Sequence, residues 1–161
     1  MSLFSFFKNR KIRKNVNDLS KMFPNFLLML AKGENGTNRV HDSVANHPDV
    51  LGFMYGFALS IMKPTREKLG FDDETMYFII YQAIADTLNR SDDMKFLGYA
   101  IVRYEDAGHP GFVEHQNMGQ EYVVAMIGLV VEDERSESVI KGIQALMGGK
   151  VYKILEENGQ I

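Results

Sequence analysis

Residues 47–63 read HPDVLGFMYGFALSIMK, a run that is apolar on nearly every side of a helix. A helix of this composition belongs in the middle of a core, because it has no broad polar face to present to water. Proline is favoured at the first helical position, and a carboxylate in the first turn meets the positive end of the helix dipole. We therefore expect the helix to begin at Pro48 and to stop before Pro64. Gly52 and Gly56, one turn apart, predict that a neighbouring helix approaches closely.

Apolar periodicity and capping signals predict further helices on both sides of this segment. They cover residues 9–23, 24–32, 72–89, 92–105, 117–131 and 136–147, with a last helical segment around 151–155. The start at Asn117 rests on a capping box with Gln120, and Gly148 with Gly149 reads as a stop. Alternation typical of a strand is not sustained, although residues 123–131 are rich enough in valine to make a strand the alternative there. The sequence predicts one all-α domain, an irregular bundle of six to eight helices.

The composition is that of a globular protein of one domain: 161 residues, 45% of them hydrophobic and 24% charged. The chain contains no cysteine, which excludes disulfides, thiolate nucleophiles, iron–sulfur clusters and Cys-ligated zinc. The N-terminus is apolar first and basic second, the reverse of a secretory signal, and no apolar run reaches the roughly 20 residues of a spanning helix. We expect a cytoplasmic protein.

Charge is divided unevenly along the chain. Residues 1–40 hold eight Lys and Arg against two Asp and Glu, whereas residues 41–161 hold ten against nineteen. We accordingly separate residues 1–14, a basic aromatic arm or first helix, from an acidic helical domain of residues 15–161. Such asymmetry bears on the choice of partners and says nothing of the fold.

The N-terminal arm combines side chains that would enter a lipid interface with side chains that would meet anionic headgroups. These are Phe4, Phe7, Lys8, Arg10, Lys11, Arg13 and Lys14. They predict, as one alternative, a peripheral protein docked on an anionic membrane or on another anionic partner. The other alternative packs the phenylalanines on the body of the protein. The sequence does not favour nucleic acid, because no stacking platform or recognition-helix pattern accompanies the cations.

The four histidines form two pairs with the same spacing, His41 with His47 and His109 with His115. Imidazole and carboxylate groups are ligands of transition metals, so one alternative is a metal-binding protein or an enzyme. Its candidate ligands are His109, His115, Glu114 and Glu105. A gap of six residues does not place both imidazoles on one helical face, so a loop would have to bring them together. The other alternative places these residues in loops and helix starts, with His47 at an N-cap.

No sequence motif identifies a family, a catalytic residue or a cofactor. Nucleophile-elbow, Walker-type and dinucleotide-binding glycine patterns are all missing, and the sequence leans away from an enzyme. We expect a binding or regulatory protein that recognises a protein partner by its surface, as adaptors, inhibitors and immunity-type proteins do. An acidic helical surface would favour a basic partner by electrostatic complementarity. A homodimer stays open as well.

Overall fold

The computed structural model describes the backbone of residues 3–25 and 39–161, and the side chains from residue 9 onward within those ranges. These residues form seven α-helices and one 3₁₀ helix and contain no strand, which confirms the all-α irregular bundle. The elements are α1 (Leu3–Met22), α3 (Asp42–Ala45), α4 (Pro48–Leu69), α5 (Asp73–Thr87), η1 (Ser91–Asp93), α6 (Met94–Asp106), α7 (Pro110–Val130) and α8 (Glu134–Glu157). Most of the predicted helix over 24–32 lies outside the described residues.

The central contact of the bundle joins α4 to α7. A Cβ atom on Gly52 would lie 2.3 Å from the carbonyl oxygen of Phe112, and one on Gly56 would lie 1.9 Å from that of Gln116. Gly119 of α7 approaches the α4 backbone in the same way. Only glycine permits such approach, so the prediction of a closely packed neighbour is confirmed. The contacts advance in the same direction along both helices, which therefore begin at the same end of the molecule.

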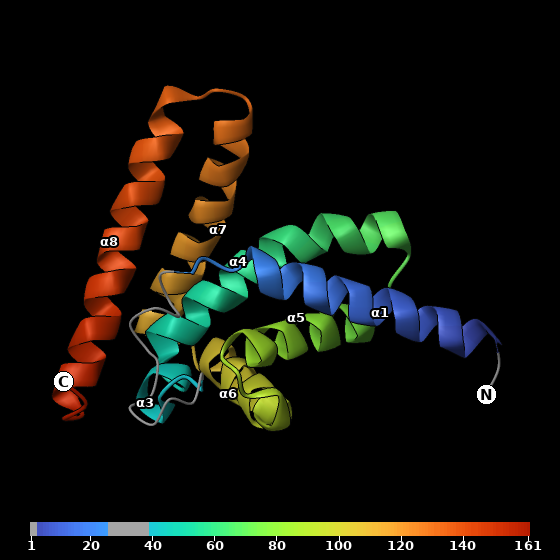
Figure 1. The fold of residues 1–161 in the computed structure, drawn as a ribbon, viewed down its shortest axis with the longest axis horizontal. Coiled ribbons are helices and arrows are strands. Elements are labelled where there is room, and N and C mark those ends of the chain that lie inside the picture. The colour runs from blue at the N-terminus through green and yellow to red at the C-terminus, as the bar shows by residue number, and fades with distance from the viewer. Residues whose placement is uncertain (1–2, 26–38) are drawn as a thin grey trace.

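The remaining helices enclose this pair unevenly. Helix α1 lies along α5 on one side, while α7 and α8 form an antiparallel hairpin whose far end rises away from the other helices (Figure 1). Aromatic rings fill the junction: the Phe23 and Phe57 centroids lie 5.1 Å apart, and those of Phe53 and Tyr122 lie 5.9 Å apart. The hairpin is thus rooted in the core at one end only.

Helix α4 does not stop before Pro64, as the sequence predicted, but continues to Leu69. The proline ring fixes φ at about −65°, a helical value, so the helix loses one backbone donor without being forced to end. The Thr65 hydroxyl adds a hydrogen bond to the carbonyl oxygen of Ile61 at 2.8 Å. The helix ends at Gly70, whose φ of 68° is left-handed and is readily adopted by glycine.

Helix α7 begins at Pro110, well before the predicted start at Asn117. Its first turn carries Phe112, which is completely buried and draws this segment into the core. Residues 106–116 fall between the predicted helices over 92–105 and 117–131, yet His109 and Pro110 repeat the pattern that correctly located the start of α4. The valine-rich stretch belongs to the same helix, so the strand alternative is wrong.

Helix α8 continues through Gly148 and Gly149, where the sequence predicted a stop. Glycine in a helix costs about 1 kcal/mol relative to alanine. Met147, Val151 and Ile154 are all buried on the same side of α8, and burying each apolar side chain contributes roughly 1.5–3 kcal/mol. The free energy gained by burying these three side chains exceeds the cost of placing two glycines inside the helix. Across the ranges described, none of the helices combines the length and the apolarity needed to cross a membrane.

Candidate functional site

Histidines cap three helices in this protein. The Nδ1 atom of His47 accepts from the backbone N–H of Asp49 at 3.3 Å, and that of His109 accepts from Phe112 at 3.4 Å. His41 caps α3 in the same manner. In each cap the Nδ1 lone pair is the acceptor of the backbone hydrogen bond. The predicted N-cap at His47 is confirmed.

Beside the two His-Pro turns lies a buried carboxylate, that of Asp49, which is only 6% exposed. Its Oδ2 atom is 2.8 Å from the Nζ of Lys150 on α8. Its Oδ1 atom is 3.8 Å from Nδ1 of His47 and 4.0 Å from Nδ1 of His115. A Cβ atom on Gly111 of α7 would lie 2.2 Å from the same oxygen, so the carboxylate fits only because this residue is glycine. We call Asp49, His47, His115 and Lys150 the Asp49 cluster.

The charges within the Asp49 cluster alter one another's ionisation. Burial alone would raise the pKa of Asp49, but the hydrogen bond from Lys150 and the neighbouring histidines outweigh it and lower the pKa below its ordinary value. The same hydrogen bond raises the pKa of Lys150. Burial lowers the pKa of His47, and the attraction of Asp49 does not offset this effect. The cluster is therefore arranged for an ionised Asp49, a charged Lys150 and a neutral His47.

The Asp49 cluster joins three helices. Asp49 lies in the first turn of α4 and contacts the first turn of α7, where the positive ends of both helix dipoles favour a carboxylate. Lys150 adds α8 to this junction. The fourth member, His115, is 5% exposed and places its Nδ1 atom 2.8 Å from the carbonyl oxygen of Gly111. Each member thus holds part of the fold together.

The four residues predicted as metal ligands have separate surroundings. His109 caps α7, and His115 belongs to the Asp49 cluster. Glu105 accepts a hydrogen bond from the hydroxyl of Tyr55 at 3.1 Å, and Glu114 is exposed. Within residues 3–25 and 39–161, no group of three or more His, Asp or Glu side chains is placed to hold a metal ion.

The basic segment is part of a longer helix, because α1 runs without interruption from Leu3 to Met22 and so crosses the predicted boundary at residue 14. Four of its predicted binding residues, Arg10, Lys11, Arg13 and Lys14, are exposed. The side chains of Phe4, Phe7 and Lys8 lie outside the described residues.

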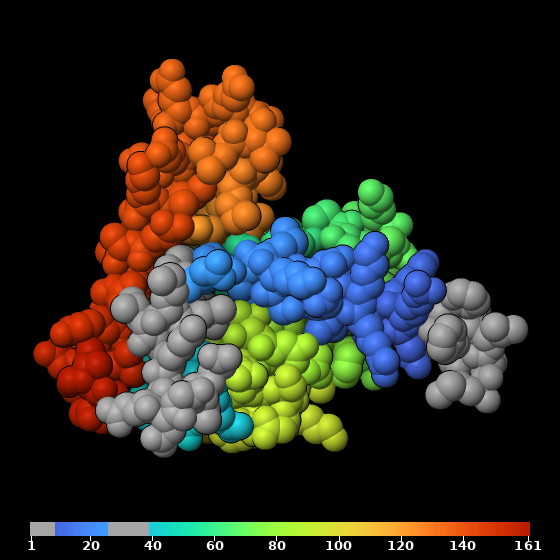
Figure 2. All heavy atoms as spheres, in the orientation of Figure 1, coloured from blue at the N-terminus to red at the C-terminus, as the bar shows by residue number. Residues whose placement is uncertain are grey.

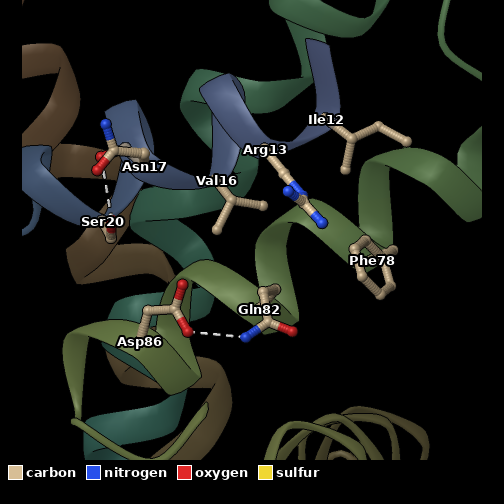
Figure 3. Close-up of a pocket in the computed structure, with 8 residues that line it drawn as sticks. All are labelled: Ile12, Arg13, Val16, Asn17, Ser20, Phe78, Gln82 and Asp86. Atoms are coloured by element: carbon tan, nitrogen blue, oxygen red, sulfur yellow. Dashed lines mark hydrogen bonds between the residues drawn. The ribbon is translucent and has the colours of Figure 1, made fainter. Parts of the chain in front are cut away.

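Helices α1 and α5 enclose an open groove of about 460 Å³. Its apolar part is formed by Ile12, Val16 and Phe78, and its polar part includes Gln82 and Asp86 (Figure 3). The Nε2 atom of Gln82 donates to Oδ1 of Asp86 at 2.7 Å, so these two polar groups satisfy each other. The remaining lining residues are Arg13, Asn17 and Ser20.

A second surface feature lies at the free end of the hairpin, which stands clear of the rest of the molecule (Figure 2). There the end of α7 exposes Val124 by 67%, Ile127 by 61% and Val130 by 83%, and the C-cap residue Val131 is exposed by 72%. The sequence predicted a helix over this stretch, with a strand as the alternative, but did not predict that its side chains are exposed. The unbroken apolar run of residues 123–131 at the end of that helix is the signal that could have identified the surface.

Beside these side chains, α7 and α8 form a small groove of about 160 Å³. It is lined by Glu121, Val124, Ala125, Asp133, Arg135, Ser136 and Val139. Asp133 is the N-cap of α8, three residues before the predicted start at residue 136, and its Oδ1 atom accepts from the backbone N–H of Arg135 at 3.1 Å. We call the groove, together with Val124, Ile127, Val130 and Val131, the hairpin surface.

The hairpin surface is strongly acidic at its edges. Residues 121–137 carry five carboxylates and one guanidinium, a net charge of −4. Exposed aliphatic side chains surrounded by charge of one sign are suited to binding a partner of the opposite sign. Comparison of the chain with protein-family models, with curated proteins and with solved structures gave no match.

Proposed function

We propose that this protein is a binding or regulatory protein of the adaptor, inhibitor or immunity type, and that it recognises a protein partner through the hairpin surface. The single observation that carries the proposal is the exposure of four large aliphatic side chains at the end of α7. In water these side chains lose the free energy that burial would provide.

The size of the apolar area supports this function. Full burial of a valine or isoleucine side chain is worth roughly 1.5–3 kcal/mol, at about 25 cal/mol for each Å² of apolar surface removed from water. Dividing the first value by the second gives the apolar area of one side chain. The four partly exposed side chains together therefore expose an apolar area on the order of 300 Å². Contiguous apolar patches of about 300–600 Å² are often functional in monomeric proteins. The hairpin surface therefore falls within the range of interaction sites.

The roles of the buried polar groups also support surface recognition. Asp49 and Lys150 pair with each other, and both His47 and His109 are used as helix caps. These contacts give the buried carboxylate of Asp49 a role in the stability of the fold. The exposed aliphatic side chains, by contrast, have no such structural role in the described residues.

The acidic edge of the hairpin surface adds a kinetic expectation. A net charge of −4 over residues 121–137 would attract a basic partner and raise its rate of encounter. Salt screens such attraction, with a Debye length that falls to about 3 Å at 1 M. Association should therefore slow as salt rises, while the apolar contact would persist.

Affinity capture from a native lysate tests the proposal when it compares two matched variants. Ile127 and Leu146 are exposed to nearly the same degree, 61% and 64%, but only Ile127 belongs to the hairpin surface. We expect at least one protein to be retained by the wild type and by Leu146→Ser and to be lost with Ile127→Ser. Identical retention on all three proteins, or retention of none, would contradict the proposal.

A further inference from the structure

We infer that the partner presents a basic amphipathic helix, which lies along the end of α7 as a third helix of the hairpin. The inference rests on the proposed function and identifies the class of partner that the hairpin surface fits. Three properties of this surface point to such a partner: the number of helices present, the spacing of the exposed side chains and the sign of the charge.

Two of the described helices form the free end of the hairpin. Helix α4 packs on the first part of α7, where Gly52 and Gly56 meet its backbone, and the last buried residue of α7 is Ala125. Beyond that point α8 is the one helix of the described ranges that accompanies α7 (Figure 1). Two helices alone bury a single seam, and a third helix packed alongside is the common way to bury a second apolar stripe.

The spacing of the exposed side chains favours a helix as the occupant. Val124, Ile127 and the C-cap residue Val131 are separated by three and four residues and therefore continue one row along the end of α7. Such rows at three- and four-residue spacing form the seams of packed helices, where side chains of one helix fit between those of the other. The adjoining groove, with Val124, Ala125 and Val139 as its apolar lining, can receive one side chain of the partner.

The charge of the hairpin surface selects a basic helix. Glu121 and Asp133 line the groove itself, and three further carboxylates follow within residues 121–137. An anionic membrane would be repelled by this surface. The same holds for the hairpin of a second copy, which carries the same net charge of −4.

The chain's own cationic helix does not supply the occupant either. From residue 9 onward, where its side chains are described, α1 buries Val16 and Leu19 in the core of its own molecule. The cations of this part, Arg10, Lys11, Arg13 and Lys14, are exposed. A second copy could offer this buried row to the hairpin surface only by dissociating it from α5, which makes a separate basic protein the better match.

Two synthetic peptides of about 18 residues, long enough to span several helical turns, test the inference with the full-length protein. One combines a leucine row with lysine on the other face, and the second has the same leucine row with glutamate in place of lysine. Fluorescence anisotropy would measure their binding to the wild type, Ile127→Ser and Leu146→Ser, and circular dichroism would check that each of these proteins is folded. Both substituted side chains are exposed, so neither change removes core packing.

We expect the lysine peptide to bind the wild type and Leu146→Ser equally, and to bind Ile127→Ser about ten-fold more weakly, the loss typical of one well-buried aliphatic contact. Raising NaCl from about 0.05 to about 0.5 M should weaken binding further. The glutamate peptide should not bind. Equal affinity for both peptides, or equal affinity of Ile127→Ser and the wild type for the lysine peptide, would overturn the inference.

The same reagents separate this inference from the proposed function. A protein captured by the wild type, lost with Ile127→Ser and not displaced by the lysine peptide would leave the proposed function standing and refute the basic helix. A dimer detected by light scattering and abolished by Ile127→Ser would assign the surface to a second copy and would also refute it. Displacement of the captured protein by the lysine peptide, and not by the glutamate peptide, would support both.

Discussion

The Nζ atom of Lys150 lies 2.8 Å from the Oδ2 atom of Asp49 and so fastens the second half of α8 to the first turn of α4. The side chain of Asp49 is 9% exposed, whereas that of Lys150 is 38% exposed. The ammonium group of a partly exposed lysine therefore pairs with a buried carboxylate. Helix α8 is held at this point by charge and, along its length, by an apolar seam with its neighbours.

Replacing Lys150 should destabilise the protein without changing its fold. Lys150→Met keeps much of the aliphatic stem but leaves the buried Asp49 carboxylate without its cation, and we expect unfolding in urea to require about 1–3 kcal/mol less free energy. Adding Asp49→Asn to this variant should recover part of the loss, because the buried group is then neutral. Equal stability of Lys150→Met and the wild type would show that the ion pair contributes nothing.

The stability of the protein should fall as the pH falls below about 6.5, the ordinary pKa of histidine. Burial lowers the pKa of His47 in the folded protein, so on acidification the unfolded chain takes up this proton before the folded one does. The lowered pKa of Asp49 also makes the protein less stable in acid, but at a lower pH. Its contribution to the stability is fully present above the ordinary pKa of 3.8 and is lost as the pH falls through the lower pKa of the folded state.

His47→Asn isolates the first of these effects, because asparagine retains an N-cap acceptor and does not titrate. Urea unfolding between about pH 7.5 and about pH 5 should show a smaller loss of stability for this variant than for the wild type. His109→Asn makes the same exchange at the N-cap of α7 and controls for the change of cap. A pH dependence unaltered by His47→Asn would rule out His47 as its source.

Two glycine-to-alanine substitutions should have opposite effects on stability. At Gly56 the added Cβ atom would lie 1.9 Å from the carbonyl oxygen of Gln116, so α4 and α7 would be forced apart at a cost of at least about 1–3 kcal/mol. Nothing lies within 4 Å of the corresponding position on Gly149, so alanine there should stabilise α8 by about 0.5–1 kcal/mol. Thermal unfolding of both variants measures the contrast, and a Gly56→Ala variant as stable as the wild type would refute the close contact.

The binding of α1 to anionic membranes can be tested by substitution. Truncation is less suitable, because it would remove part of a helix that packs on α5. Four exposed cations, Arg10, Lys11, Arg13 and Lys14, can all be changed to glutamine. If the segment docks on lipid, the wild type should sediment with vesicles rich in phosphatidylserine, and the fourfold variant should stay largely in the supernatant, since each cation is worth about 1 kcal/mol at such a surface. Equal sedimentation of the two proteins would dismiss the membrane alternative.

Much of the fold could be predicted because local signals happened to agree with tertiary packing. Pro48 follows a histidine that caps the helix, and Asp72 accepts from the backbone N–H of Thr75 at 2.7 Å, so two helix starts followed directly from the sequence. The stop signals misled at Pro64 and Gly149, which are both unfavourable inside a helix and both lie inside one. At Gly149 burial opposes the signal, because Met147, Val151 and Ile154 are held in the core. At Pro64 the backbone angle that the ring fixes is itself helical.

The candidate sites were harder to predict, since each depends on residues far apart in the chain. Asp49 read as an ordinary first-turn carboxylate, and nothing near it in sequence pointed to Lys150. The hairpin surface was hidden for another reason. Ile127 and Val131 are of residue types that usually lie in a core. They are exposed because the end of the hairpin extends beyond α4.

By itself the sequence determined that this protein is helical, that the segment around Gly52 and Gly56 forms its centre, and that charge is divided between a basic beginning and an acidic remainder. These are properties of composition, spacing and capping, which act over a few residues. The tertiary structure decided which carboxylate is buried, which lysine meets it and which apolar side chains remain in water. These depend on whether a neighbouring helix is present, and packing between distant segments settles that question.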